Sequence, residues 1–167
     1  MKLLILILSS LSLNLLSDSV LERFNIIIKN DLTFNHRSLD SNNEVSESVG
    51  SLIHDGEVIL INVDSPFKER YQISEKTINI YDFDFNQSRS ISLNELDSAI
   101  LDYLINGILD EELISKKTSN TISIKDNQTE IHIELNNSNN FFIKYKDNLG
   151  ITNFVDFKVR NTIWIYF

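Results

Sequence analysis

The sequence has no cysteine, one proline and four glycines among its 167 residues. The absence of cysteine excludes disulfides and thiolate zinc sites, and it means that the chain is not itself a lipid-modified lipoprotein. The few glycines form no glycine-rich loop that could hold a phosphate. These absences argue against disulfide scaffolds, zinc modules and nucleotide-binding loops.

Basic residues are scarce as well. Fifteen lysines and arginines stand against 24 aspartates and glutamates, which gives a net charge of −9. Such a chain lacks the basic patch that attracts nucleic acid, and an anionic membrane surface does not draw it electrostatically. Hydrophobic residues make up 42% and charged residues 23% of the chain. These proportions and the length favour one folded domain.

The N-terminus combines one positive charge with a run of leucine and isoleucine. Lys2 precedes an apolar segment that continues to Leu16. A positive start followed by about 7–15 apolar residues is typical of a secretory signal peptide, and a buried N-terminal helix is the alternative. We predict a signal peptide over residues 1–17 and a mature domain over residues 18–167.

Two segments follow the spacing of helices with one apolar face. The first begins after Asp18 or Ser19 and carries Val20, Leu21, Phe24, Ile27 and Ile28. The second begins at Leu93 and carries Leu96, Ile100, Leu101, Leu104 and Ile105, with Gly107 as a suitable end. Beyond it, one or two further helical turns are expected over Leu109, Leu113 and Ile114.

Most of the remaining chain alternates apolar and polar residues, as half-buried strands do. Asp55-Gly56 lies between two such runs and predicts a two-residue hairpin. We expect a loop over 38–48, a strand from Leu32, and strands over 49–54, 57–63, 67–73, 77–91, 121–125, 130–135, 141–146, 151–159 and 162–167. Successive hairpins without a βαβ rhythm predict a single curved antiparallel sheet or barrel of about eight to ten strands.

The densest run, residues 77–91, breaks its alternation once. Ile80 shares its parity with Asp82 and Asp84, so a straight strand would place both aspartates on the isoleucine face. A turn or bulge near residues 81–84 removes the conflict. We therefore expect two sheet segments, joined around Asp82, that show apolar residues to one interior.

Large apolar residues, including ten phenylalanines, are numerous for a lone sheet. If two short helices cover the sheet incompletely, they leave an apolar cavity that would bind an apolar ligand. The alternative is that the same residues fill an ordinary core. The residues by themselves leave both possibilities open.

Catalytic constellations are absent from the sequence. There is no Gly-x-Ser-x-Gly, and the three histidines lie far apart without a second ligand at metal-binding spacing. Asp82-Phe83-Asp84 has the form of a metal-binding Asp-x-Asp, although two turn carboxylates around a phenylalanine fit the alternation better. A hydrolase that uses these aspartates or a histidine stays as a hypothesis.

The central run also resembles a known family. An apolar strand ending in Tyr81-Asp82, followed by Asp84 and Gln87, is similar to the hallmark of the periplasmic outer-membrane lipoprotein carrier (LolA-like) family. Residues 66–71 resemble the preceding family segment, a proline followed by an aromatic-basic strand ending in tyrosine. The N-terminal helix, the helical insertion after Leu93 and the late residues 149–152 follow the family order.

The resemblance implies a mainly β (α+β) fold, an unclosed antiparallel β-barrel or strongly curved sheet with an N-terminal helix and a central helical lid. It implies a monomeric periplasmic carrier, with no catalysis and no cofactor, that receives acylated lipoproteins from an inner-membrane transporter and delivers them to an outer-membrane acceptor. A regulator that senses lipid or lipoprotein on the same scaffold is the alternative. The candidate cavity residues are Phe67, Tyr71, Ile80, Phe83 and Phe85 in the sheet, and Ile100, Leu101 and Leu104 in the lid.

Overall fold

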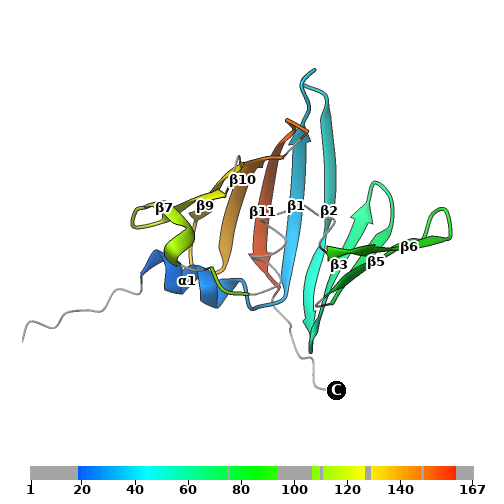
Figure 1. The fold of residues 1–167 in the computed structure, drawn as a ribbon, viewed down its shortest axis with the longest axis horizontal. Coiled ribbons are helices and arrows are strands. Elements are labelled where there is room, and N and C mark those ends of the chain that lie inside the picture. The colour runs from blue at the N-terminus through cyan, green and yellow to red at the C-terminus, as the bar shows by residue number, and fades with distance from the viewer. Residues whose placement is uncertain are drawn as a thin grey trace, which may run out of the picture.

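The computed structural model describes residues 19–74, 76–93, 107–109, 111–126, 129–147 and 149–160. These ranges form one antiparallel sheet of eleven strands with a short N-terminal helix, α1 (Val20–Ile27), and one 3-10 turn, η2 (Glu111–Leu113) (Figure 1). The predicted mainly β fold and the predicted N-terminal helix are confirmed. The predicted signal peptide, the lid helix from Leu93 and the strand over 162–167 lie outside the described residues, apart from the ends of the lid segment.

The sheet consists of two meanders joined along the middle. Its order is β6-β5-β4-β3-β2-β1-β11-β10-β9-β8-β7, so β6 and β7 are its two edges. The strands are β1 (Leu32–Leu39), β2 (Val45–Asp55), β3 (Val58–Ser65), β4 (Glu69–Ile73), β5 (Thr77–Asp82), β6 (Gln87–Ser92), β7 (Ile114–Lys117), β8 (Thr121–Asp126), β9 (Thr129–Leu135), β10 (Asn140–Lys146) and β11 (Thr152–Val159). Pairing of β1 with β11 brings the first and last described strands together.

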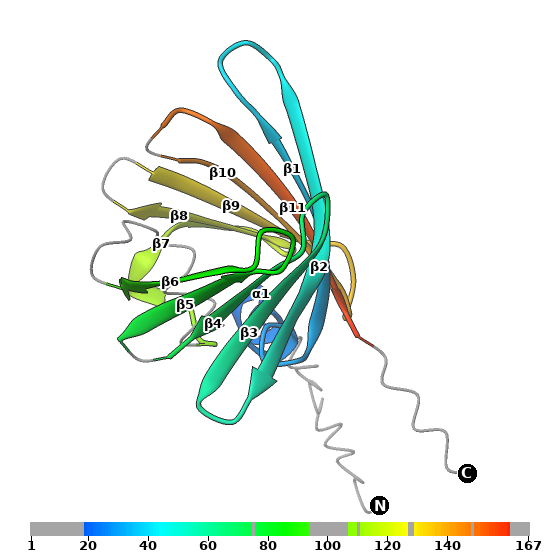
Figure 2. The same ribbon diagram turned by 90° about the vertical axis from the view of Figure 1, so that its right-hand side faces the viewer.

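The sheet is strongly curved (Figure 2). Arg89 and Ile91 of β6 line the same cavity as Ile143 and Tyr145 of β10, although six strands separate β6 from β10 in the sheet. Neighbouring strands lie about 4.8 Å apart, so a flat sheet would hold these residues far from one another. The curvature gives the sheet a concave face, and the inward side chains of the strands lie on it.

Helix α1 covers the part of the concave face that β7 to β10 form. Phe24 of α1 is 1% exposed, and its ring meets that of Phe141 edge-on at 5.2 Å. Phe141 stacks on Phe157 of β11 at 4.8 Å. The Arg23 guanidinium donates a hydrogen bond to the Ser119 carbonyl in the β7–β8 turn. These contacts fix α1 against one half of the sheet and leave the other half to the cavity.

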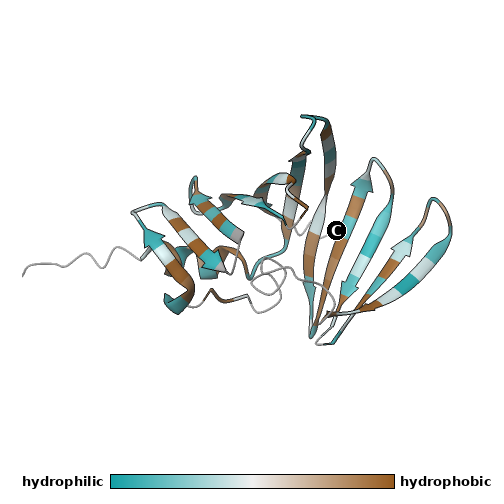
Figure 3. Ribbon diagram, turned by 45° about the horizontal axis from the view of Figure 1, so that its top comes forward, coloured by the Kyte–Doolittle hydropathy of each residue, from teal (hydrophilic) through white to brown (hydrophobic). Residues whose placement is uncertain are grey.

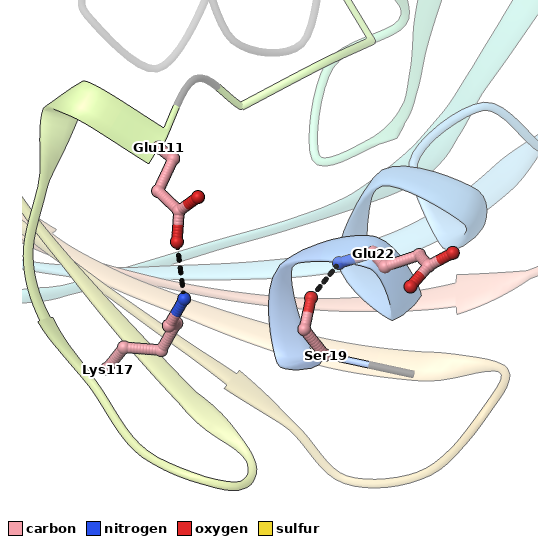
Figure 4. A network of polar contacts seen from close by, with 4 residues as sticks. All are labelled: Ser19, Glu22, Glu111 and Lys117. Carbon is pink, nitrogen blue, oxygen red and sulfur yellow. Dashed lines mark hydrogen bonds and ion pairs between the residues drawn. The ribbon is translucent and has the colours of Figure 1, made fainter. Parts of the chain in front are cut away.

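Polar contacts define the ends of the short elements (Figure 4). Ser19 Oγ accepts the Glu22 backbone N–H at 3.2 Å and so caps α1. Lys117 Nζ lies 2.6 Å from Glu111 Oε1 and links the end of β7 to η2. The capping bond forms where the sequence predicted the helix to start.

One predicted connection is wrong, and a second is confirmed only in part. The loop expected over residues 38–48 is a turn of Asp40–Glu44 only, in which Asp40 Oδ1 accepts the N–H groups of Asn42 and Glu44 at 2.8 Å each. The flanking residues continue β1 and β2 as a polar hairpin that projects beyond its neighbours (Figure 2). A projecting hairpin has no core to cover, so its strands carry no apolar alternation. The helical turns expected after Leu109 give only η2, because the chain enters β7 at Ile114.

In the part of the chain that the structure describes, no helix is both long and apolar enough to cross a membrane.

Candidate functional site

A cavity of about 680 Å³ opens on the concave face, beside the half that α1 covers. Its volume lies within the range of about 300–1,000 Å³ that ligand sites occupy. Strands β1 to β6, β10 and β11 supply its wall. Its apolar lining consists of Phe34, Leu52, Ile61, Val63, Pro66, Phe67, Ile73, Ile78, Ile80, Ile91, Ile143, Val155 and Phe157. The sequence was compatible with either an apolar cavity or a filled core, and the structure contains the cavity.

The strand register explains why these residues share one wall. Leu52, Ile61, Tyr71 and Ile80 stand opposite one another on β2, β3, β4 and β5, and so form one row across the sheet. Side chains alternate between the faces of a strand, so a row of this kind presents all its members to one side. The brown and teal bands along each strand in Figure 3 show the same alternation.

The cavity wall also holds a charged and hydrogen-bonded group of side chains. Tyr71 Oη donates to Glu69 Oε2 at 2.6 Å. Burial, followed by this hydrogen bond and the negative charge of Glu69, raises the pKa of Tyr71 to about 12. Arg89 lines the same wall from β6. The phenol of Tyr71 therefore stays protonated at neutral pH and keeps Glu69 paired beside the apolar row.

A second polar group lies on β1, β2 and β11. His36 Nε2 is 2.9 Å from Asn153 Oδ1, and His36 Nδ1 is 3.3 Å from Ser48 Oγ. The Asn153 amide nitrogen donates to Asp147 Oδ2 at 3.4 Å and to the Ile151 carbonyl at 3.2 Å. These bonds fix the amide so that its oxygen faces His36, whose Nε2 donates and whose Nδ1 accepts from the Ser48 hydroxyl.

The predicted site residues separate into three groups. Phe67, Tyr71 and Ile80 line the cavity. Phe83 and Phe85 do not, which corrects the expectation that they form its wall. The lid residues Ile100, Leu101 and Leu104 lie outside the described residues.

Phe83 and Phe85 miss the wall because β5 ends at Asp82 and the turn begins at once. The expectation required a second sheet segment that includes both phenylalanines, but β6 begins only at Gln87 and leaves them in the turn. Phe83 is 55% exposed, and its ring lies 5.6 Å from the Arg70 guanidinium carbon. Phe85 is 64% exposed and lies 6.4 Å from the Phe67 ring.

The two aspartates of the central run serve the turn itself. Asp82 Oδ1 accepts the N–H groups of Asp84 at 3.1 Å and Phe85 at 3.0 Å. Asp84 Oδ2 accepts the Lys68 N–H at 2.7 Å. The turn interpretation of Asp82-Phe83-Asp84 is therefore confirmed. Within the described ranges, no group of three or more histidine, aspartate or glutamate side chains is arranged to hold a metal ion.

Most of the lining residues were not among the predicted site residues, for example Phe34, Leu52, Ile61 and Phe157. Every strand that lines the cavity was predicted at least in part, but the residue-by-residue register between the strands was not. Once Ile80 is known to face inward, the register across β4, β3 and β2 identifies Tyr71, Ile61 and Leu52 in turn. The missing signal was pairing rather than composition.

Comparison with known proteins gives a resemblance of fold. No protein-family model matches the sequence, and no curated protein matches it. Among solved structures, this structure is similar to the crystal structure of the LolA superfamily protein NE2245 from Nitrosomonas europaea, with a TM-score of 0.46 and 10% sequence identity over 85% of this chain and 92% of that one. At this identity, no ligand-contacting residue transfers from that protein to this chain.

Proposed function

We propose that this protein is a periplasmic carrier that binds the acyl chains of lipoproteins in the concave cavity and moves them between the inner and outer membranes. The supporting observation is the apolar cavity of about 680 Å³ on a sheet that α1 covers on one half only. The resemblance of residues 66–71 and 81–87 to the LolA-like family narrows the cargo from apolar ligands to acylated lipoproteins.

The energetics of acyl chains suit such a cavity. Each buried CH₂ group contributes about 0.8 kcal/mol, so a lipoprotein cannot cross water with its chains exposed. A carrier must bury the chains and also release them, which an open cavity allows and a closely packed core does not. No covalent step or cofactor is required for this role.

The location and partners form part of the proposal. Residues 1–17 would direct export and then be removed, which leaves residues 18–167 as the carrier domain. The partners would be acylated lipoproteins, an inner-membrane transporter that releases them and an outer-membrane acceptor.

The test is binding of a lipoprotein by the delipidated mature chain. The protein is incubated with a diacylated lipoprotein, and the mixture is separated by size-exclusion chromatography. We expect a soluble complex of the two; if the lipoprotein stays aggregated and none elutes with the protein, the carrier role fails.

Two matched substitutions locate the binding site. Ile61 is half-buried on β3 and lines the cavity, whereas Ile53 is half-buried on β2 and faces the opposite side of the sheet. Ile61→Asn should lower the yield of complex severalfold, since a polar group then stands in the apolar row. Ile53→Asn should leave the yield near that of the unmodified protein. Equal losses in both variants would point away from the cavity.

A further inference from the structure

The concave face changes polarity along its strands. From one end of β1 to the other, the inward residues run from Leu32 and Phe34 to His36. On the neighbouring strand β2, the corresponding inward residues run from Leu52 to Ser48 and Ser46. The same change occurs on β10, from Phe141 to Tyr145, and on β11, from Phe157 to Asn153. The cavity therefore has an apolar end and a polar end, and the polar end lies beside the projecting β1–β2 hairpin.

The strand register gathers the polar residues into two adjacent rows. Tyr145 and Asn153 stand opposite each other, and the row continues through β1 to Ser46. His36 and Ser48 stand opposite each other in the next row. Tyr145, Ser46, His36 and Ser48 line the cavity, whereas Ser38, which continues the row on β1, does not. Asn153 is 5% exposed behind the lining residues.

Two hydroxyl groups at the polar end have no hydrogen-bond partner in the part of the chain that the structure describes. Ser48 and Asn153 each form a hydrogen bond with His36. The hydroxyls of Ser46 and Tyr145 make no hydrogen bond to any other described residue. Burial, followed by the charge of Asp147, raises the pKa of Tyr145, so its phenol remains a donor. The Ser46 and Tyr145 hydroxyls thus line the polar end of an apolar cavity and have no acceptor among the described residues.

We propose that the Ser46 and Tyr145 hydroxyls bind the ester carbonyls at the root of two acyl chains. The ligand would be a glycerol diester that lies with its chains toward Phe34 and Leu52 and its headgroup at the β1–β2 hairpin. This inference rests on the proposed function, and it adds which chemical group is recognised and which way the cargo points. An ester carbonyl is an acceptor without a donor, which complements these two hydroxyls.

The test compares ester with ether lipids of equal chain length. Dioctanoylglyceryl-cysteine peptide and its dioctyl ether form one pair; dioctanoyl phosphatidylglycerol and its dioctyl ether form the other. Each is titrated into the delipidated protein by calorimetry. We expect the ester to bind about tenfold more tightly than its ether, as two neutral hydrogen bonds of ordinary net strength would give. Binding of the glyceryl-cysteine peptides would identify the ligand as a lipoprotein, and binding of the phosphatidylglycerols would identify it as a membrane phospholipid.

Two double variants make the test specific. Ser46→Ala with Tyr145→Phe should bring the ester-to-ether ratio close to one, with little change in ether binding. Ser90→Ala with Tyr81→Phe removes the same groups from residues that do not line the cavity, and it should keep the ratio. If the first double variant fails to fold, Ser46→Ala alone, an exposed position on the hairpin, should lower the ratio about threefold.

The outcomes separate the two proposals. A wild-type ratio of one, or a ratio that the Ser46 and Tyr145 substitutions leave unchanged, would overturn the carbonyl site while the chains still bind. If none of the four lipids binds, the proposed carrier function fails and this inference fails with it.

Discussion

The ring of Phe34 occupies the space that a side chain at position 50 would fill. A Cβ added to Gly50 would lie 2.6 Å from Phe34 Cζ and 2.0 Å from the Asn62 carbonyl oxygen. The β2–β3 register shifts between Val49 and Gly50, so the bulge and the missing side chain together admit the phenyl ring to the cavity wall.

Gly50→Ala should therefore destabilise the protein. The backbone oxygen of Asn62 cannot move aside as a flexible side chain can, and overpacking of this kind costs about 1–3 kcal/mol. Urea unfolding followed by circular dichroism measures the loss. Gly56 is a suitable comparison, because its φ is +63° and nothing lies within 4 Å of an added Cβ. Gly56→Asn should change the free energy of unfolding by only a few tenths of a kcal/mol, since asparagine tolerates this conformation.

Phe24→Ala should detach α1 from the sheet. The side chain is fully buried against Phe141, and such truncations cost about 3–5 kcal/mol. Ile26 lies on the same helix and is 58% exposed, so Ile26→Ala should cost less than about 0.5 kcal/mol. Thermal unfolding of both variants provides the comparison. A small loss at Phe24 would mean that α1 contributes little to the fold.

Alkaline pH should weaken the fold through Tyr71. Its pKa is raised from 10.0 to about 12 in the folded protein, so the unfolded chain releases this proton first. The contribution of this raised pKa to the free energy of unfolding is complete below pH 10.0 and is lost as the pH rises toward 12. Tyr71→Phe should show a smaller fall in unfolding free energy across that interval, measured by urea unfolding at several pH values.

Glu69→Gln should lower the pKa of Tyr71, because the hydrogen bond and the charge of Glu69 both raise it. Titration of the tyrosine absorbance at alkaline pH, with Tyr71→Phe to assign the signal, detects the change. Glu47→Gln removes a carboxylate from β2 that does not line the cavity, and it should leave the Tyr71 titration where it was. No change in Glu69→Gln would mean that burial alone sets this pKa.

Ser19→Ala should destabilise the protein more than Glu111→Gln. The serine hydroxyl caps α1, and loss of such a cap costs about 1 kcal/mol. The Glu111–Lys117 ion pair has side-chain exposures of 69% and 38%, and exposed pairs contribute about 0–1 kcal/mol. Unfolding in low and high salt distinguishes the cap from the ion pair, since only the destabilisation caused by Glu111→Gln should become smaller with salt.

Local pattern was sufficient to predict most of the elements. The apolar spacing of Val20, Phe24 and Ile27 predicted α1, and Asp55-Gly56 predicted the β2–β3 turn, where Gly56 has a positive φ. These features depend on residues that are close in the sequence. The polar extension of β1 and β2 could not be found in this way, because backbone pairing without a core leaves no apolar alternation.

The cavity was predictable only in part. Parity placed Ile80 on the correct face. Phe83 has the opposite parity and was selected because a second sheet segment was expected directly after Asp82, whereas β6 begins only at Gln87. The opposite wall comes from β10 and β11, which no local pattern connects to β5. Curvature brings these strands together, and curvature arises from twist and pairing across the whole sheet.

The pairing of β1 with β11 has a consequence for the order of folding. Leu32 stands opposite Val159, so the ladder in the middle of the sheet closes the longest loop in the chain. The hairpins from β2 to β6 can form while the chain is still emerging, whereas the two halves can join only after the last strand is free. This last step is slow, because the long loop must close before any β1–β11 contact stabilises it. A chain that threads a membrane channel before it folds would gain from that delay.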